Sequence, residues 1–172
     1  GCGSQLRPRV IGPVPALKMM LTGRHINAKK ALSMGILDSI SDNVVQESID
    51  FAKKIAKDTN EHPLVRHLND KIIDSRGDDN VLTDARSLVA KTRKGQFAPG
   101  QIIKCVESAI NCDNFDEGLK KEQEYFVECL LHPQREAMIN IFFGERSASK
   151  VSDIPKDTKL IDIKKAGIIG SG

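Results

Sequence analysis

The sequence lacks long apolar runs, metal-type cysteine spacings and an excess of charge of one sign. Its longest apolar run, from Met138 to Phe143, is broken by Asn140 and is far shorter than the roughly 20 residues that span a bilayer. The 26 basic and 23 acidic residues leave a scattered charge of +3, which gives no reason to expect nucleic acid or a membrane as a partner. We expect no metal site and no disulfide framework, because the spacing of the four cysteines fits reduced thiols in a cytosol-like compartment: Cys2, Cys105, Cys112 and Cys129.

What is present describes an ordinary globular protein. The length of 172 residues favours one domain, and 40% hydrophobic with 28% charged residues lies outside the disordered range. The chain opens at Gly1 without an initiator methionine, signal peptide or transit segment, and it closes where apolar residues run into Gly170 and Gly172. We therefore expect an internal part of a longer protein.

Prolines, glycines and capping residues predict a succession of short helices. The expected helices cover residues 16–21, 28–34, 44–57 and 81–94, and three more begin near residues 99, 113–114 and 133. Residues 36–40 are expected to be extended, 58–80 a loop, 147–164 a linker and 165–169 a strand. Three apolar stripes are expected to pack inward: Val45, Ile49, Ala52 and Ala56; Leu119, Phe126 and Leu130; and Ala137, Met138, Ile141 and Phe142.

The first constellation with possible chemistry is the segment from Gly1 to Arg9. Small residues followed by a helix can bring backbone N–H groups close to a ligand, although a tight turn explains the same spacing. The segment resembles the Gly-Gly-Thr-Gln-Arg-Leu-Pro-Arg stretch of the enoyl-CoA hydratase (crotonase) superfamily, with Cys2 in place of the first glycine and Leu6-Arg7 inverted. The Leu-Thr-Gly, Ala-x-x-Ala and Gly-Leu-Val-Asp patterns of that family follow at Leu21–Gly23, Ala28–Ala31 and Gly35–Asp38.

The resemblance continues through Ala98-Pro99, Glu117–Leu119, Arg135–Ala137 and Phe142–Arg146 and covers essentially the whole chain. It is greatest to the bifunctional members of peroxisomal type, which fuse an enoyl-CoA hydratase/isomerase to a 3-hydroxyacyl-CoA dehydrogenase. It implies a mostly α chain with three parts: the C-terminal part of a crotonase-type α/β domain (1–150), a linker (151–164) and the first strand of a Rossmann domain (165–172).

The second constellation is Gly170-x-Gly172 after the apolar residues Ile168 and Ile169. Such glycines open a dinucleotide-binding turn, where they let the backbone approach the pyrophosphate at a helix N-terminus. A flexible glycine tail is the alternative, and the resemblance upstream favours the turn. We therefore predict Gly170 and Gly172 as NAD-binding residues.

The resemblance also implies the chemistry of a longer parent protein. The parent would hydrate a trans-2-enoyl-CoA and oxidise the 3-hydroxyacyl-CoA with NAD, in the cytoplasm of a bacterium or the peroxisome of a eukaryote. Gly3 would lie at the acyl-CoA substrate, and the helices would contact the dehydrogenase half. Both catalytic glutamates of the family lie before the matching segment, so we name no catalytic residue and expect this chain alone to be inactive.

Two other functions stay open: a non-catalytic helical interaction module, and a crotonase-family enoyl-CoA isomerase. The remaining candidates favour structural roles. Cys105 and Cys129 lie on apolar faces and are interpreted as core residues. We expect a solvated face with lysine partners for Glu117, Glu122 and Glu124. The basic residues 91–94 are expected to stabilise the C-terminus of their helix, and a phosphate contact to coenzyme A is the less favoured interpretation there.

Overall fold

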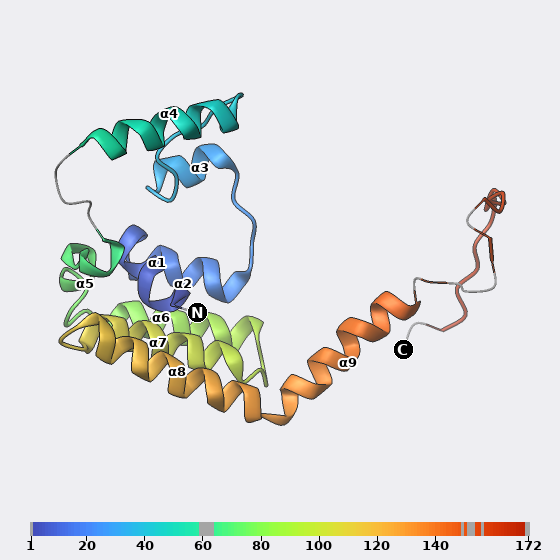
Figure 1. The fold of residues 1–172 in the computed structure, drawn as a ribbon. Coiled ribbons are helices and arrows are strands. Elements are labelled where there is room, and N and C mark those ends of the chain that lie inside the picture. Colours follow the sequence, from blue (N-terminus) through green and yellow to red (C-terminus); the bar gives the residue numbers. More distant parts are fainter. Residues whose placement is uncertain (1, 59–63, 149, 151–153, 156, 171–172) are drawn as a thin grey trace. The chain divides into compact units, whose positions relative to one another are not determined.

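The computed structural model describes residues 2–58, 64–148, 150, 154–155 and 157–170. Helices dominate these residues, and no strand occurs among them (Figure 1). The chain divides into two units, one up to Arg135 and one from Glu136 onward. The mostly α character expected from the sequence is therefore confirmed, whereas the predicted boundary at residue 150 stays a prediction.

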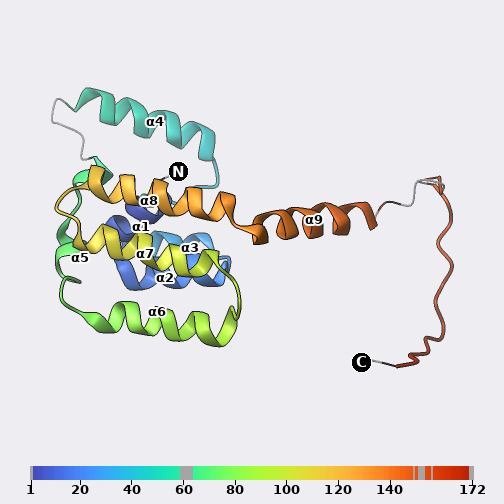
Figure 2. The ribbon, with the colours of Figure 1, turned by 90° about the horizontal axis from the view of Figure 1, so that it is seen from below.

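The first unit contains eight α-helices and one 3₁₀ turn within its described residues, and a last helix runs on into the second unit. The helices are α1 (Gly3–Ile11), α2 (Pro13–Thr22), α3 (Ala28–Ser33), α4 (Val44–Lys57), η1 (Val65–His67), α5 (Asp70–Ile73), α6 (Asp79–Thr92), α7 (Ala98–Asn111), α8 (Phe115–Leu131) and α9 (Pro133–Ala148). In Figure 2 helix α7 runs between α8 and α6 and in front of α1 and α2, and it contacts all four of these helices.

Local sequence fixes most helix ends, as expected. Three asparagine side chains accept a hydrogen bond from the backbone N–H three residues later and cap α3, α4 and α8: Asn27, Asn43 and Asn114. Gly23 ends α2 with a φ of 64°, in the left-handed region where a side chain is disfavoured. These caps explain why the predicted and observed helices agree closely.

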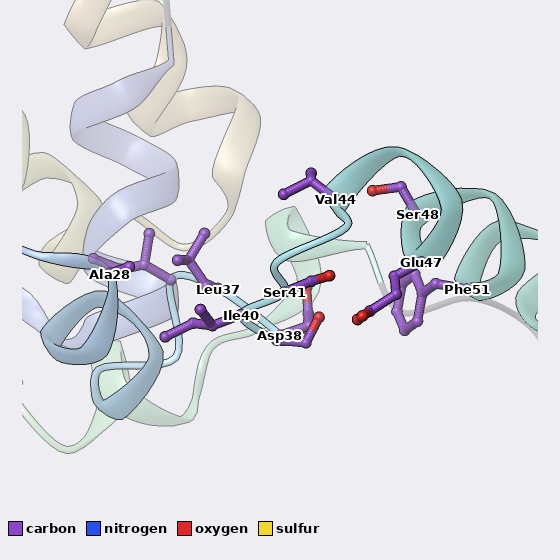
Figure 3. A pocket seen from close by; sticks show the side chains of 11 residues that line it. Ala28, Leu37, Asp38, Ile40, Ser41, Val44, Glu47, Ser48 and Phe51 are labelled. Carbon is purple, nitrogen blue, oxygen red and sulfur yellow. The ribbon is translucent and has the colours of Figure 1, made fainter.

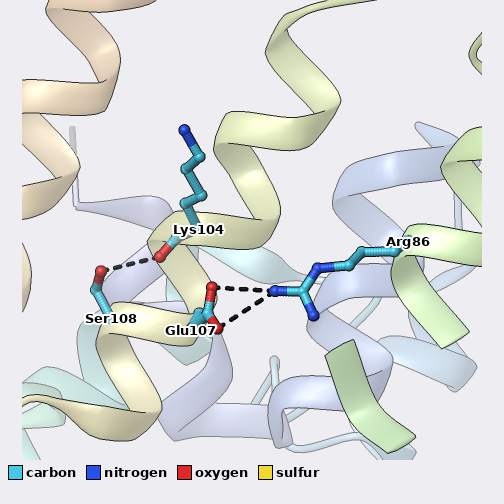
Figure 4. Close-up of polar contacts among 4 residues, drawn as sticks. All are labelled: Arg86, Lys104, Glu107 and Ser108. Atoms are coloured by element: carbon cyan, nitrogen blue, oxygen red, sulfur yellow. Dashed lines mark hydrogen bonds and ion pairs between the residues drawn. The ribbon is translucent and has the colours of Figure 1, made fainter. Parts of the chain in front are cut away.

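The core of the first unit lies where α2, α6 and α7 meet. Its buried members are seven apolar side chains: Leu17, Leu21, Val81, Ala85, Ile103, Val106 and Ile110. An ion pair at the edge of this core joins α6 to α7, since Arg86 Nη2 lies 3.3 Å from Glu107 Oε2 (Figure 4). Arg93 also ties α6 to α2, because its guanidinium donates to the carbonyls of Leu21 (3.2 Å) and Thr22 (3.1 Å). Arg93 of the basic cluster at residues 91–94 therefore caps the neighbouring helix α2, while Lys91 lies in the last turn of α6, as predicted.

The structure corrects three expectations. The loop expected over 58–80 contains η1 and α5, and Ile72 of α5 is buried. Residues 165–170 form no strand, because a strand is held by hydrogen bonds to a neighbour and the described residues offer none. The apolar stripes of α4 and α9 do not pack inward, since neither helix has a buried residue.

The stripe of α8 is only partly covered, since Phe126 is 60% exposed. No helix in the described residues is long and apolar enough to cross a membrane.

Candidate functional site

The predicted substrate residue Gly3 begins helix α1, directly after a residue with unusual backbone geometry. Cys2 has a φ of 69°, which no other described non-glycine residue approaches. Left-handed backbone costs an L-residue roughly 1–2 kcal/mol and costs glycine almost nothing. The glycine that the crotonase pattern has at the position of Cys2 is therefore the residue that this geometry favours.

Glu122 of α8 occupies the N-terminus of α1. Its carboxylate accepts a hydrogen bond from the Cys2 backbone N–H at 2.6 Å and another from the Ser4 hydroxyl. A negative charge at this place satisfies free N–H groups and suits the helix dipole. The expectation that Glu122 lies on a solvated face is wrong, whereas Glu117 does pair with Lys121, at 3.7 Å. Nothing local in the sequence marks Glu122, because its partners lie more than 110 residues away.

Gly3 itself is exposed, and a Cβ built on it would meet no atom within 4 Å. The chain's own packing therefore does not require glycine at this position. Its assignment to substrate binding stays a prediction, and the free space around it makes that prediction testable.

A largely apolar pocket of about 470 Å³ opens beside this N-terminus, between α1, α7 and α8. We call it the α1/α8 pocket. Cys2 and Ser4, the neighbours of Gly3, line it together with Ile102 and Phe126. A volume of several hundred Å³ with apolar walls suits a small apolar group.

One buried acceptor lies on the wall of the α1/α8 pocket. Gln101 is 4% exposed, and its amide nitrogen donates to Glu128 Oε2 at 2.5 Å. Its Oε1 has no hydrogen-bond partner. A buried, unpaired carbonyl is costly, so the wall carries one acceptor that a polar ligand atom could satisfy.

Two cysteines also line the α1/α8 pocket, and neither has the environment of a nucleophile. Burial raises the pKa of the Cys105 thiol to about 11, and burial also raises the pKa of Cys129. Because the thiolate is the reactive form, these thiols are poorly activated at neutral pH. The interpretation of Cys105 as a core residue is confirmed by its burial, while Cys129 is half-buried at the pocket wall.

A second hollow, also about 470 Å³, lies between residues 36–41 and α4. Figure 3 shows Leu37 and Ile40 on one side of it and Val44 and Phe51 on the other. None of the four residues of the predicted α4 stripe (Val45, Ile49, Ala52 and Ala56) lines this hollow.

Of the two predicted NAD-binding glycines, the structure describes Gly170. Gly170 has a φ of 80°, in the left-handed region that favours glycine. Gly172 lies outside the described residues. In the described part of the chain no group of three or more histidine, cysteine or acidic side chains is placed to hold a metal ion.

Comparisons with known proteins match the whole chain. It is 33% identical over 175 residues to the peroxisomal bifunctional enzyme of Cavia porcellus, an alignment that covers 99% of this chain and 24% of that protein. It is 32% identical over 180 residues to the fatty acid oxidation complex subunit alpha of Shewanella sp. strain ANA-3, an alignment that covers 100% of this chain and 24% of that protein. The peroxisomal bifunctional enzyme of Pongo abelii is 32% identical over 177 residues, an alignment that covers 99% of this chain and 24% of that protein.

No family model matches the chain. The alignments nevertheless extend from end to end at about one identity in three, and the chain spans about a quarter of the length of these curated relatives. These relatives support the bifunctional enoyl-CoA hydratase family, to which the chain is similar along its whole length.

Proposed function

We propose that this chain is part of a fatty acid oxidation enzyme that hydrates a trans-2-enoyl-CoA to the 3-hydroxyacyl-CoA and oxidises that product with NAD. The observation that carries the proposal is the end-to-end similarity to peroxisomal bifunctional enzymes and fatty acid oxidation complex alpha subunits. The order of the crotonase-like patterns from Gly1 to Arg146 agrees with it.

Within such an enzyme the chain supplies walls rather than catalytic groups. Adding water across the double bond needs two carboxyl groups as base and acid, and N–H donors for the thioester enolate. In the crotonase superfamily these groups precede the segment that resembles residues 1–9. The α1/α8 pocket beside Gly3, with its apolar lining, supports a role for this chain in enclosing the acyl-CoA substrate.

The C-terminal residues belong to the oxidising half in this proposal. Residues 165–169 would gain strand partners from the dehydrogenase half, and Gly170 and Gly172 would form the turn that faces the pyrophosphate of NAD. The left-handed φ of Gly170 suits such a turn. Residues 151–164 would then link the two halves of the enzyme. Limited proteolysis of the complete enzyme would cut within these residues rather than within 99–146. The enzyme would be peroxisomal in a eukaryote or cytoplasmic in a bacterium.

The test uses two glycine variants of the complete enzyme with opposite expected defects. Gly3→Ala has room for its Cβ within this chain, so unfolding should be unchanged while enoyl-CoA hydration falls. Gly172→Val should abolish oxidation of the 3-hydroxyacyl-CoA while hydration continues, because a side chain there blocks the approach to the pyrophosphate.

Gly100→Ala, also without an atom in the way, serves as the control that leaves both activities intact. The 172-residue chain alone should not hydrate a short trans-2-enoyl-CoA. Hydration by that chain, or normal NAD affinity and oxidation in the Gly172 variant, would contradict the assignment.

A further inference from the structure

The α1/α8 pocket has a polar feature that the enclosure of an acyl chain does not use. Ser4 and Glu122 of its lining are hydrogen-bonded to one another. Gln101 differs from them, because its amide nitrogen donates to Glu128 while its Oε1 is buried without a partner. A hydrocarbon chain in the pocket would leave this oxygen unpaired, which is unfavourable. The pocket therefore suits a ligand that donates a hydrogen bond.

The charges and thiols of the lining favour a neutral ligand. Among the described residues that line the pocket, Glu122 alone carries a charge. Its carboxylate repels an anion, and an ammonium group would lose its hydration in these largely apolar surroundings. Burial raises the pKa of the Cys105 and Cys129 thiols, so both stay uncharged at neutral pH. The donor that fits is an uncharged hydroxyl or amide group.

The apolar walls favour a flat aromatic body. Tyr125 and Phe126 line the pocket, and Phe126 still exposes 60% of its surface. Aromatic rings in stacked or edge-to-face contact attract one another beyond the effect of the area that they bury. The sulfur atoms of Cys105 and Cys129 are polarisable neighbours for such a ring. A rigid ring also loses less conformational freedom on binding than a flexible chain does.

We propose that the α1/α8 pocket binds a phenol, an uncharged aromatic ring that carries one hydroxyl group. The hydroxyl group donates to Gln101 Oε1, and the ring lies against Phe126. The terminal torsion of a glutamine side chain is soft, so the amide can turn toward the ligand, and its exposed partner Glu128 can follow. The volume of about 470 Å³ lies in the range of roughly 300–1,000 Å³ that small-molecule sites occupy.

The experiment is calorimetric titration of the 172-residue chain at neutral pH with two probes, para-propylphenol and para-propylanisole. The anisole differs by one methyl group on the oxygen and cannot donate a hydrogen bond. The phenol should bind about tenfold more tightly, because the anisole leaves Gln101 Oε1 unpaired and places an ether oxygen beside it.

One variant and one matched control locate the hydrogen bond. Gln101→Met keeps the length of the side chain and removes the acceptor, so the two probes should bind within about twofold of one another. Gln123→Met makes the same change at an exposed glutamine of the same pocket and should keep the tenfold preference for the phenol. Far-UV circular dichroism checks that both variants are folded.

A second measurement needs no variant. Nuclear Overhauser contacts between the ring protons of the phenol and Phe126 should appear in the unsubstituted chain. The proposal is overturned if neither probe binds, if the two bind alike, or if these contacts are missing. It is equally overturned if folded Gln101→Met keeps the preference, because the acceptor then lies elsewhere. It does not rest on the proposed hydratase and dehydrogenase activities, which the two glycine variants test separately.

Discussion

Replacing Gly118 by alanine tests how closely α1 packs against α8. Gly118 is buried in the first half of α8, and a Cβ there would overlap Gln5 Oε1 and lie 3.2 Å from Gln5 Cδ. Gln5 cannot move aside freely, because its side chain is fully buried and its amide nitrogen donates to the Cys105 carbonyl at 2.8 Å. The added methyl group must therefore displace Gln5 or separate the two helices.

The expected net effect is a loss of about 1–3 kcal/mol in the free energy of unfolding. Overpacking a well-packed interior typically costs about 1–3 kcal/mol. Weakening the buried hydrogen bond of Gln5 adds about 1 kcal/mol, and the better helix propensity of alanine returns about 1 kcal/mol. Gly100→Ala, in α7, meets no atom within 4 Å and should instead stabilise the chain by up to about 1 kcal/mol.

Urea unfolding followed by far-UV circular dichroism measures both variants. The two should shift the midpoint in opposite directions with an unchanged dependence on denaturant. Gln5→Ala combined with Gly118→Ala should cost less than the sum of the two single changes, since the truncated side chain makes room for the methyl group. A Gly118→Ala chain as stable as the Gly100→Ala chain would refute the close packing of α1 on α8.

Three further predictions concern the N-terminus of α1 and the core thiol. Glu122→Gln should lower the free energy of unfolding in urea by about 1–3 kcal/mol, because the Cys2 N–H and the Ser4 hydroxyl lose their charged acceptor. The control Glu124→Gln, on an exposed part of α8, should lower it little. Cys2→Gly should stabilise the chain by up to about 1 kcal/mol by relieving its left-handed backbone, and Cys2→Ala should not. The pKa of the Cys105 thiol is 9.0 in the unfolded chain and about 11 in the folded chain. The free energy of unfolding should therefore be unaffected by the ionisation of this thiol below pH 9 and should fall between about pH 9 and 11, where the unfolded chain releases the proton more readily. Cys105→Ala should reduce that loss in unfolding curves measured across the interval.

The sequence predicts the helices better than it predicts their surroundings. Capping by Asn27 and Asn114 is a local effect, and both helices begin where the caps indicate. The inward packing of Met138 and Phe142 is not local, because it depends on a surface that the described residues of the second unit do not supply. Helical periodicity shows which face is apolar but not what covers it.

The candidate site shows the same division between local and distant causes. The N-terminal small residues identify α1 as a place of interest, and the structure does put a pocket beside it. The sequence does not predict the positions of Glu122 and Gln101, because each has the pattern of an ordinary polar surface residue on an amphipathic helix. Only the fold brings them to the start of α1 and to the pocket wall.

The contacts of α1 also determine when this helix can become stable during synthesis. The Cys2 backbone N–H at its start donates a hydrogen bond to Glu122, 120 positions later. The buried Gln5 side chain donates to the carbonyl of Cys105, 100 positions later. At about 5–20 residues per second, roughly 6–24 seconds pass between the synthesis of Cys2 and that of its acceptor. Until then the polar groups of Gln5 and Arg9, which are buried in the folded chain, face water on the nascent chain. The chain is helical, but its first helix depends on distant contacts, so it should fold more slowly than a bundle whose helices pack on their neighbours in sequence.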